Sequence, residues 1–256
     1  MRERAQDNHI NHSNDMRFKY FLFFICLTLI SCKETQKEYY ENGKLKAVYI
    51  LKDGVLIDSS LFYNKEKSFI EKINYYLPND SIRTKFLNEN GKIESTGIFF
   101  NNQKYGKWNY FTVKGKLDKV FEYKNIEGKQ YTNQSWHFNS NGDTIKNLGS
   151  YFILKPIPKT ILIKQRLIID LELKPLLTPN PEAFICISSE INDDFSNLSS
   201  ISLDTVSLPS EGAIVEMSFK NKGGKNVRGF ITEYVNNKNN TTSSKNTYFD
   251  IPILVK

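Results

Sequence analysis

Apolar and polar residues alternate along most of the chain with a period of two, which is typical of β-strands and not of helices. In the segment 167–173 every second residue is leucine or isoleucine, and Asp170 and Glu172 lie between them. The segments 215–219 and 249–255 alternate in the same way. We therefore expect strands in the C-terminal part of the chain at 151–154, 160–163, 167–173, 183–188, 201–208, 213–220, 227–235 and 248–255.

Short strands in such number, separated by polar turns, indicate two packed antiparallel sheets. Proline recurs between Pro156 and Pro181, and the Asn-Gly turns of the preceding part of the chain stop at about residue 150. The sequence therefore predicts an immunoglobulin-like β-sandwich over residues 153–256. The polar stretch 236–246 is expected to be the loop of its last hairpin.

The N-terminal half contains a repeated pattern with a period close to 24 residues. In each copy two aromatic or apolar residues precede a polar turn with glycine, and a lysine with leucine or isoleucine usually follows. A degenerate copy at Leu61–Lys67 has Lys67 in the glycine position. The glycines of the other turns are Gly43, Gly91, Gly115 and Gly142.

Each copy predicts a β-hairpin, because glycine supplies the positive φ of a tight turn and the flanking residues favour strands. No copy can bury its aromatic face alone. We therefore expect the hairpins of residues 37–152 to stack into an elongated sheet. The fold class predicted for the whole chain is all-β.

One unit is the most complete: Asn90-Gly91-Lys92, then Gly106-Lys107-Trp108, then Asn109-Tyr110-Phe111. This order resembles the MORN-repeat variant of the YwqK-type antitoxin family. The resemblance covers about residues 37–152 and implies stacked β-hairpins in which Gly106 and Trp108 are structural. The second unit lacks its turn glycine, and the Gly-x-Trp element is clear only once.

The N-terminus carries a signal sequence. Residues 16–19 include two basic side chains, and the apolar run 20–30 is too short for a bilayer-spanning helix, which needs about 20 residues. The run ends in Leu29-Ile30-Ser31-Cys32, which resembles the lipobox of bacterial lipoproteins. The resemblance implies cleavage between Ser31 and Cys32 and acylation of Cys32.

Further expectations follow from this signal. Because the signal is complete without residues 1–15, Met16 is predicted to be the true start, with 1–31 removed and 32–36 forming a short tether. Lys33 stands where an aspartate would retain an enteric lipoprotein in the inner membrane, so the resemblance implies the outer membrane. The composition, rich in Lys, Asn and Ile, is typical of Bacteroidota.

The distribution of charge and the few reactive side chains limit the classes of function that the sequence supports. The formal net charge is +7, but the lysines are interleaved with acidic residues, so no nucleic-acid partner is expected. His137 is the only histidine after the signal, and Cys186 lies in an apolar segment typical of a buried thiol. No catalytic residue, metal ligand or cofactor is predicted, and the acidic segment 190–194 is expected to be a solvated loop.

Two groups of residues could bind a partner. Trp108, Tyr110, Trp136 and Phe138 could form an aromatic platform for a carbohydrate, although rings of this kind equally suit the core of stacked hairpins. Segment 227–234 resembles a strand of uncharacterised Bacteroidota lipoproteins. Its Arg228 and Glu233 are interpreted as cross-strand pairing residues at the surface.

The leading functional hypothesis is a non-catalytic envelope lipoprotein, held in the membrane through Cys32, that binds a protein or glycan partner. One alternative is an immunity or antitoxin-like protein that neutralises a toxin at the envelope. A second alternative is a hydrolase of surface polymers.

Overall fold

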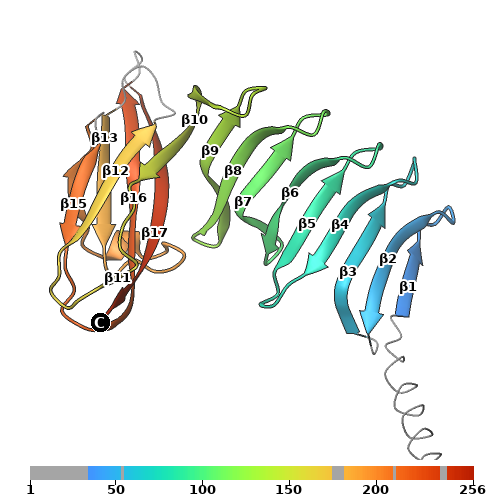
Figure 1. Ribbon diagram of the computed structural model, residues 1–256, viewed down its shortest axis with the longest axis horizontal. Helices are drawn as coiled ribbons and strands as arrows, with labels where there is room; N and C mark the ends of the chain where they lie inside the picture. Colours follow the sequence, from blue (N-terminus) through green and yellow to red (C-terminus); the bar gives the residue numbers. More distant parts are fainter. Residues whose placement is uncertain (1–33, 53–54, 175–181, 210–211, 237–240) are drawn as a thin grey trace, which may run out of the picture.

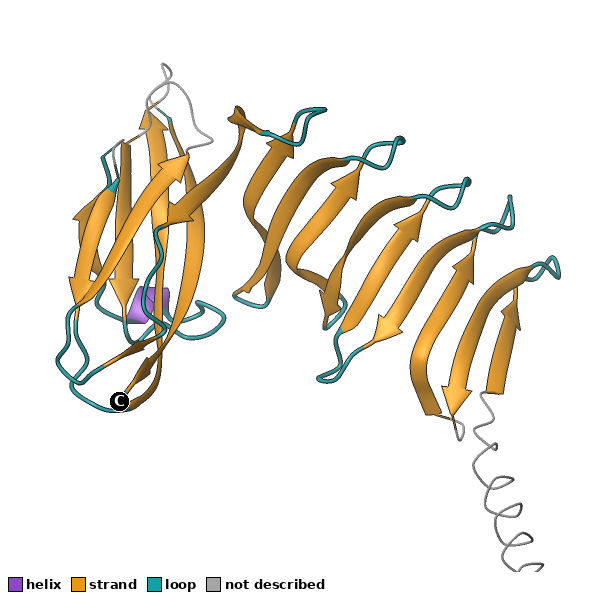
Figure 2. Cartoon of the chain, viewed as in Figure 1, coloured by secondary structure: helices purple, strands orange, loops and turns teal. Residues whose placement is uncertain are grey.

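The computed structural model describes residues 34–52, 55–174, 182–209, 212–236 and 241–256, and these residues form an all-β fold (Figures 1 and 2). Two sheets dominate, one of twelve strands and one of five, and all their pairings are antiparallel except that of the first strand of the smaller sheet, Thr160–Ile161, with the strand Thr242–Val255. This confirms the predicted fold class. Among the described residues, no helix has the length and apolar character to cross a bilayer.

The first ten strands pair in chain order, each antiparallel to the next, and form the long sheet in Figure 1. We call these strands the hairpin array. Its strands are β1 (Glu34–Tyr39), β2 (Leu45–Lys52), β3 (Val55–Tyr63), β4 (Ile70–Tyr76), β5 (Ile82–Leu87), β6 (Ile93–Phe100), β7 (Gln103–Phe111), β8 (Leu117–Ile126), β9 (Lys129–Phe138) and β10 (Thr144–Leu154).

Four turns at one edge of the array share one geometry. In each, the glycine N–H donates to the carbonyl three residues earlier at 2.8–3.0 Å, and only the glycine has positive φ. This is the three-residue hairpin loop with glycine in the left-handed position, rather than a two-residue Asn-Gly turn. The glycines are those predicted: Gly43, Gly91, Gly115 and Gly142.

The degenerate second turn differs from the prediction. It is one residue longer, because Asn64 N–H donates to Phe69 O, and the positive φ falls on Ser68 instead of Lys67. The Asn64 side chain stabilises this longer turn by accepting hydrogen bonds from the backbone N–H groups of Glu66 and Lys67.

Lysines join each of these turns to the next one. Lys44 Nζ donates to Glu66 O at 2.6 Å, and Lys116 Nζ donates to Ser140 O at 2.9 Å. Between them, Lys67 pairs with the Glu89 carboxylate, and Lys92 Nζ lies 3.5 Å from Val113 O. Along the turn edge these contacts form a lysine ladder, which accounts for the lysine in each of the first four turns.

The interior of the array consists largely of small residues beneath aromatic rings. On one face, Ser60 and Thr84 are fully buried although they are polar, and the Thr84 hydroxyl donates to Asn74 Oδ1 at 2.9 Å. Trp108 is also fully buried, and its indole N–H donates to Ile98 O at 3.0 Å. A single-layer sheet thus buries its rings against its own backbone.

Two glycines make the burial of Trp108 possible. Gly106 has φ +64°, which permits a bulge in β7. In this bulge three residues of β7, Gly106, Lys107 and Trp108, lie opposite the single residue Gly97 of β6. At Gly97, a Cβ would lie 2.3 Å from the indole ring of Trp108, so only glycine leaves room for the ring. This is the physical basis of the Gly-x-Trp motif.

The sandwich follows without a linker. Its strands are β11 (Thr160–Ile161), β12 (Leu167–Lys174), β13 (Glu182–Ser188), β14 (Asp204–Ser207), β15 (Ala213–Met217), β16 (Gly223–Asn236) and β17 (Thr242–Val255), with a 3₁₀ turn at Leu198–Ser200. One layer contains β10, β12 and β15, and the other has the order β11-β17-β16-β13-β14. This is the A-B-E and C′-C-F-G arrangement of an immunoglobulin-like sandwich.

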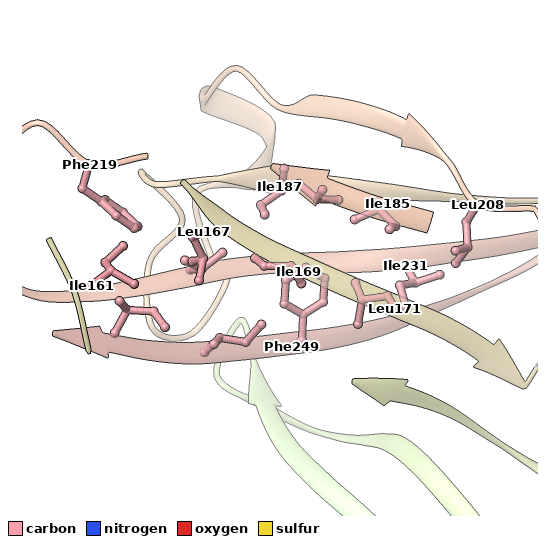
Figure 3. Close-up of a cluster of buried hydrophobic side chains, with 14 of the residues drawn as sticks. Ile161, Leu167, Ile169, Leu171, Ile185, Ile187, Leu208, Phe219, Ile231 and Phe249 are labelled. Atoms are coloured by element: carbon pink, nitrogen blue, oxygen red, sulfur yellow. The ribbon is translucent and has the colours of Figure 1, made fainter. Parts of the chain in front are cut away.

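The alternating residues of β12 form the middle of the sandwich core. Leu167, Ile169 and Leu171 are fully buried and face side chains of the second layer, among them Ile231 and Phe249 (Figure 3). The two layers bury these faces against each other as predicted from the period-two pattern.

Two predicted boundaries change. Strand β10 pairs with β9 through Ser150 and with β12 from Tyr151, so the boundary predicted between residues 152 and 153 falls inside a continuous strand. Residues 34–36, predicted to be tether, belong to β1. The predicted signal 1–31 and the lipidation site Cys32 lie outside the described residues.

The close contact between Gly97 and Trp108 gives a first prediction. Gly97→Ala is expected to lower the free energy of unfolding by about 2 kcal/mol, the cost of overpacking a filled site. Urea denaturation followed by tryptophan fluorescence measures this. Gly224→Ala is the matched control, because a Cβ there meets nothing within 4 Å, and an equal loss in both variants would contradict the prediction.

Candidate functional site

Aromatic side chains recur in one straight row across the array. The strand register aligns Ala47, Phe62, Lys72, Phe86, Ser95, Tyr110, Lys119 and His137, one from each strand from β2 to β9. Rings therefore lie on alternate strands, at β3, β5, β7 and β9. We call Phe62, Phe86, Tyr110 and His137 the ring row.

Each ring of the row rests beside a small or polar neighbour and stays partly exposed. The adjoining inner row contains the buried residues Ser60, Asn74 and Thr84. Tyr110 packs against Phe121 with a centroid distance of 5.4 Å, and Phe121 packs edge-on against His137 at 6.0 Å. The rings of the row are thus separate from one another, except that Phe121 of the inner row bridges Tyr110 and His137.

Lysine ammonium groups lie over the rings. Lys72 Nζ is 3.9 Å from the centroid of Phe62, and Lys119 Nζ is 5.8 Å from the centroids of Tyr110 and Phe121. These are cation–π contacts, in which the negative face of the ring attracts the cation. They leave positive charge beside the rings at the surface.

One lysine is enclosed by three rings next to the row. Lys104 Nζ lies 4.5 Å from the centroid of Trp108, 5.3 Å from Tyr110 and 5.4 Å from Tyr123, and it donates to Tyr110 Oη at 2.8 Å. Burial of Tyr123, together with its hydrogen bond to Tyr110, raises its pKa to about 12. The Tyr123 hydroxyl therefore stays neutral at physiological pH and keeps its hydrogen bond with Tyr110.

The predicted platform of four aromatic residues is not one surface. Trp108 and Tyr110 share a face, whereas Trp136 is opposite Val120 in the register and lies on the other face, as does Phe138 two residues further. Trp108 is fully buried and cannot stack on a ligand. Trp136 instead stacks on Tyr151 at 5.6 Å. Of the four, only Tyr110 lies in the ring row.

Sequence reasoning missed Phe62, Phe86, Lys72 and Lys119 as candidates. The signal was present, because Phe62, Phe86 and Tyr110 are spaced by 24 residues, the period of the repeat. The spacing predicts the hairpins, whereas the face on which each ring lies depends on the pairing register and its bulges.

A second polar cluster lies where the array meets the sandwich, and we call Asn133, Ser150, Glu233 and Lys245 the polar joint. Lys245 Nζ donates to Asn133 O at 3.0 Å and to Ser150 Oγ at 3.1 Å. The Ser150 hydroxyl donates to Glu233 Oε1 at 3.2 Å. Asn133 also accepts from Tyr248 N–H at 2.7 Å and donates to Tyr248 O at 2.8 Å.

One charge of the joint, that of Glu233, is buried, and the other, that of Lys245, is half-buried. Glu233 is 1% exposed and lies directly opposite Lys245 in the register of β16 and β17. Burial lowers the pKa of Lys245, and the negative charge of Glu233 partly offsets this. The predicted cross-strand pairing of Glu233 thus occurs, but inside the molecule and not at its surface, because β9 and β10 cover this part of β16 and β17.

Arg228 has the predicted cross-strand partner at the opposite end of β16. Its guanidinium contacts Asp250 at 3.1 Å and Asp193 at 2.5 Å, and donates to Ile191 O at 3.0 Å. The side chain is 12% exposed and borders an open depression of about 1450 Å³. These contacts tie the acidic loop 190–194 to the sandwich.

The remaining candidate thiol, Cys186, lies in the sandwich beside Phe230 and Tyr248. Cys186 is buried, and burial raises its pKa, although the Thr205 hydroxyl 3.7 Å away opposes this shift. Within the described part of the chain, no three His, Cys, Asp or Glu side chains are placed to hold a metal ion.

Comparisons with known proteins do not identify the chain. No protein-family model and no curated protein matches it. Solved structures similar to part of it are accessory secretory protein 1, 2 and 3 of Streptococcus pneumoniae (19% identity, TM-score 0.27, 42% of this chain and 20% of that chain) and TarM (17% identity, TM-score 0.29, 52% and 22%).

A mutant TarM from S. aureus is similar at 14% identity and a TM-score of 0.29, over 54% of this chain and 30% of that chain. The chain thus spans less than a third of the length of these proteins. At such TM-scores the likeness supports no inference on function. The resemblance of the repeats to MORN-type hairpins stays a prediction from the sequence.

The buried charges of the joint generate a stability prediction. Lys245→Met leaves the Glu233 carboxylate buried without its cation and is expected to cost about 3–5 kcal/mol of unfolding free energy. The double variant Glu233→Gln, Lys245→Met should recover part of this loss. Lys155→Met, which removes an exposed partner of Asp170, is the control and should change stability little.

A pH dependence follows from the same residue. Because the pKa of Lys245 is lowered on folding from 10.5, the unfolded state binds more protons between the two pKa values, and stability due to this group rises with pH there. Thermal unfolding of the wild type and of Lys245→Met between pH 7 and 10.5 tests this. The difference between them should widen with pH, and parallel profiles would contradict it.

Proposed function

We propose that this protein is a non-catalytic, lipid-anchored protein of the bacterial cell envelope that binds an extracytoplasmic protein or glycan. Its hairpin array would act as a rigid arm between the membrane and the sandwich. The aromatic and lysine side chains along the array would make the contacts with the partner.

One observation carries the proposal: the first strand among the described residues starts at Glu34, two residues after the predicted lipidation site, and the strands that follow it lead to the sandwich without a linker. Strand β10 belongs to both parts, and the polar joint ties β9 to β17. Lipidation of Cys32 would therefore place the first strand of the array directly at the membrane surface.

The dimensions support an arm. Nine inter-strand steps of about 4.8 Å separate β1 from β10, so β10 lies about 43 Å from the strand next to the anchor. A protein with three acyl chains on one cysteine is durably anchored. The arm would present its ring row, and the sandwich at its end, at a defined distance from the anchor.

Membrane partition of wild type and Cys32→Ala in the native host tests the anchor. The wild type is expected in the membrane fraction and Cys32→Ala in the soluble fraction, since the acyl chains supply the membrane affinity. Equal partition of the two forms would refute lipid anchoring. Proteinase treatment of intact cells then distinguishes a surface-facing arm, which is digested, from a periplasmic one, which is protected.

The binding role is tested by crosslinking the anchored protein in its native host. Recovery of a glycan or of an envelope protein supports the proposal. Turnover of a glycan or peptide by the purified protein would instead support a hydrolase. A single stoichiometric toxin-like partner would support the immunity alternative.

A further inference from the structure

One end of the sandwich is basic and contains no acidic residue. It is formed by three segments, 156–165, 217–226 and 251–256, and none of them contains Asp or Glu. No ion pair within the described part of the chain involves a lysine of these segments. We call this surface the lysine end, and its lysines are Lys159, Lys164, Lys220, Lys222, Lys225 and Lys256.

Backbone hydrogen bonds hold the three segments together. Lys164 N–H donates to Phe219 O at 2.9 Å. Ile163 N–H donates to Lys256 O at 3.2 Å, and Lys256 N–H donates to Ile161 O at 2.9 Å. Ile161 and Phe219 are buried in the sandwich core (Figure 3). The lysine end is therefore one fixed surface and not a set of independent loops.

The acidic side chains of this half of the sandwich are largely paired. The open depression beside Arg228 is lined by two carboxylates, those of Asp204 and Asp250, but also by three lysines of the lysine end, so positive groups outnumber negative ones even there. The ion pairs of the region are Asp170–Lys155, Glu216–Arg166, Asp250–Arg228 and Asp193–Arg228.

These carboxylates also lie at a different level from most of the lysine end. Asp204 lies one residue from the level of Arg228 in the strand register, and Asp193 ties the loop 190–194 to Arg228. From Arg228, β16 continues for five residues to Gly223, a length of about 17 Å, which exceeds the Debye length of about 8 Å at physiological salt. The positive charge beyond Gly223 is therefore not cancelled by them.

Two leucines are exposed on the same surface. Leu162 is 63% exposed and Leu254 is 44% exposed. Apolar side chains beside lysines are typical of surfaces that lie on a membrane, where the cations contact the headgroups and the apolar side chains enter the boundary with the acyl chains.

The lysine end faces the same way as the predicted membrane anchor. Figure 1 shows the beginning of β1 and the C-terminal end of β17 on one side of the molecule, opposite the edge with the glycine turns. Strand β1 begins two residues after Cys32, the predicted lipidation site. A membrane that holds Cys32 can therefore also reach the lysine end.

We infer that the lysine end binds the anionic phospholipid surface of the membrane that holds the lipid anchor. This inference rests on the proposed function and adds a second membrane contact to it. The ammonium groups attract the headgroup phosphates, and Leu162 enters the headgroup layer. The array then runs alongside the membrane between the two contacts. Salt weakens the second contact, because it is largely electrostatic.

The test measures vesicle binding by the mature chain without its lipid, residues 32–256 with Cys32→Ala, which contains every described strand. Sedimentation with vesicles of phosphatidylglycerol and phosphatidylcholine in equal parts is compared with sedimentation with phosphatidylcholine alone. We expect binding to the anionic vesicles to be at least about tenfold tighter and to be lost at about 0.5 M salt. Equal binding to both vesicles, or binding to neither, would overturn the inference.

Charge variants locate the contact. Lys220→Gln with Lys222→Gln should weaken binding to the anionic vesicles about tenfold, because two ammonium groups near the headgroups are lost. Lys65→Gln with Lys114→Gln removes the same charge from exposed positions at the turn edge and should bind like the unsubstituted chain. An equal effect of the two pairs would show that only the net charge matters and would overturn the inference.

A leucine variant separates a membrane from a soluble polyanion. Leu162→Ser should weaken vesicle binding about fivefold by removing an inserted side chain. The matched control is Val113→Ser, at a position that is 79% exposed at the turn edge, and it should have no effect. Unchanged vesicle binding by Leu162→Ser, or tighter binding to inorganic polyphosphate than to the vesicles at equal phosphate concentration, would overturn the inference.

The lipidated protein in anionic vesicles tests whether both contacts meet one membrane. An environment-sensitive dye on Leu162→Cys should report an apolar environment, and the same dye on Val113→Cys should report water. Cys186 is buried and Cys32 would be acylated, so the dye would react with the introduced thiol. Water at both positions would overturn the inference.

Circular dichroism and thermal unfolding verify that each variant is folded. If the lipidated protein stays in the membrane at high salt while the folded variants of the lysine end bind vesicles like their controls, the proposed function stands and the second contact is wrong. If the chain without lipid binds anionic vesicles but Cys32→Ala does not alter partition in the host, the lipid anchor is wrong instead.

Discussion

The hairpin array depends on one constraint: a sheet of one layer has no second sheet against which to bury its apolar side chains. The rings of this protein are buried instead against small residues of their own face, with Trp108 over Gly97 as the tightest case. Lysine stems and ammonium groups cover what remains exposed, as Lys72 does over Phe62. The alternation of rings with small residues along the register therefore stabilises the sheet and also leaves the ring row at its surface.

The sandwich buries its apolar side chains between two layers, and its core consists mainly of branched aliphatic side chains. The change from the single-layer array to the two-layer sandwich occurs within β10, where the inward-facing residues change from Ser150 to Phe152. Glu233 and Lys245 lie at this transition and both hydrogen-bond with Ser150. Their buried hydrogen bonds fix the register of β17 against β9 and so set the orientation of the sandwich on the array.

Much of the fold could be predicted from local patterns. Turn glycines and period-two alternation are local properties, and they located the hairpins and the strands of the sandwich. The polar stretch 236–246 was predicted to be loop because its residues are hydrophilic, yet residues 242–246 belong to β17, where their backbone pairs with β16 and Lys245 is half-buried in the joint. The prediction of a four-residue aromatic platform was wrong for a related reason. Bulges such as that at Gly106 and the face of each strand decide which rings meet, and both depend on pairing between strands.

The lysine ladder has a consequence for how such an array changes in evolution. Each turn lysine reaches the turn that follows, so every unit is fitted to its successor by the same contact. Insertion of a single residue in a strand would disturb that contact and shift the rings that follow it to the other face. Duplication or loss of a complete unit preserves both. The length of the arm is therefore expected to vary among descendants of this gene in whole steps of two strands, about 9.6 Å each.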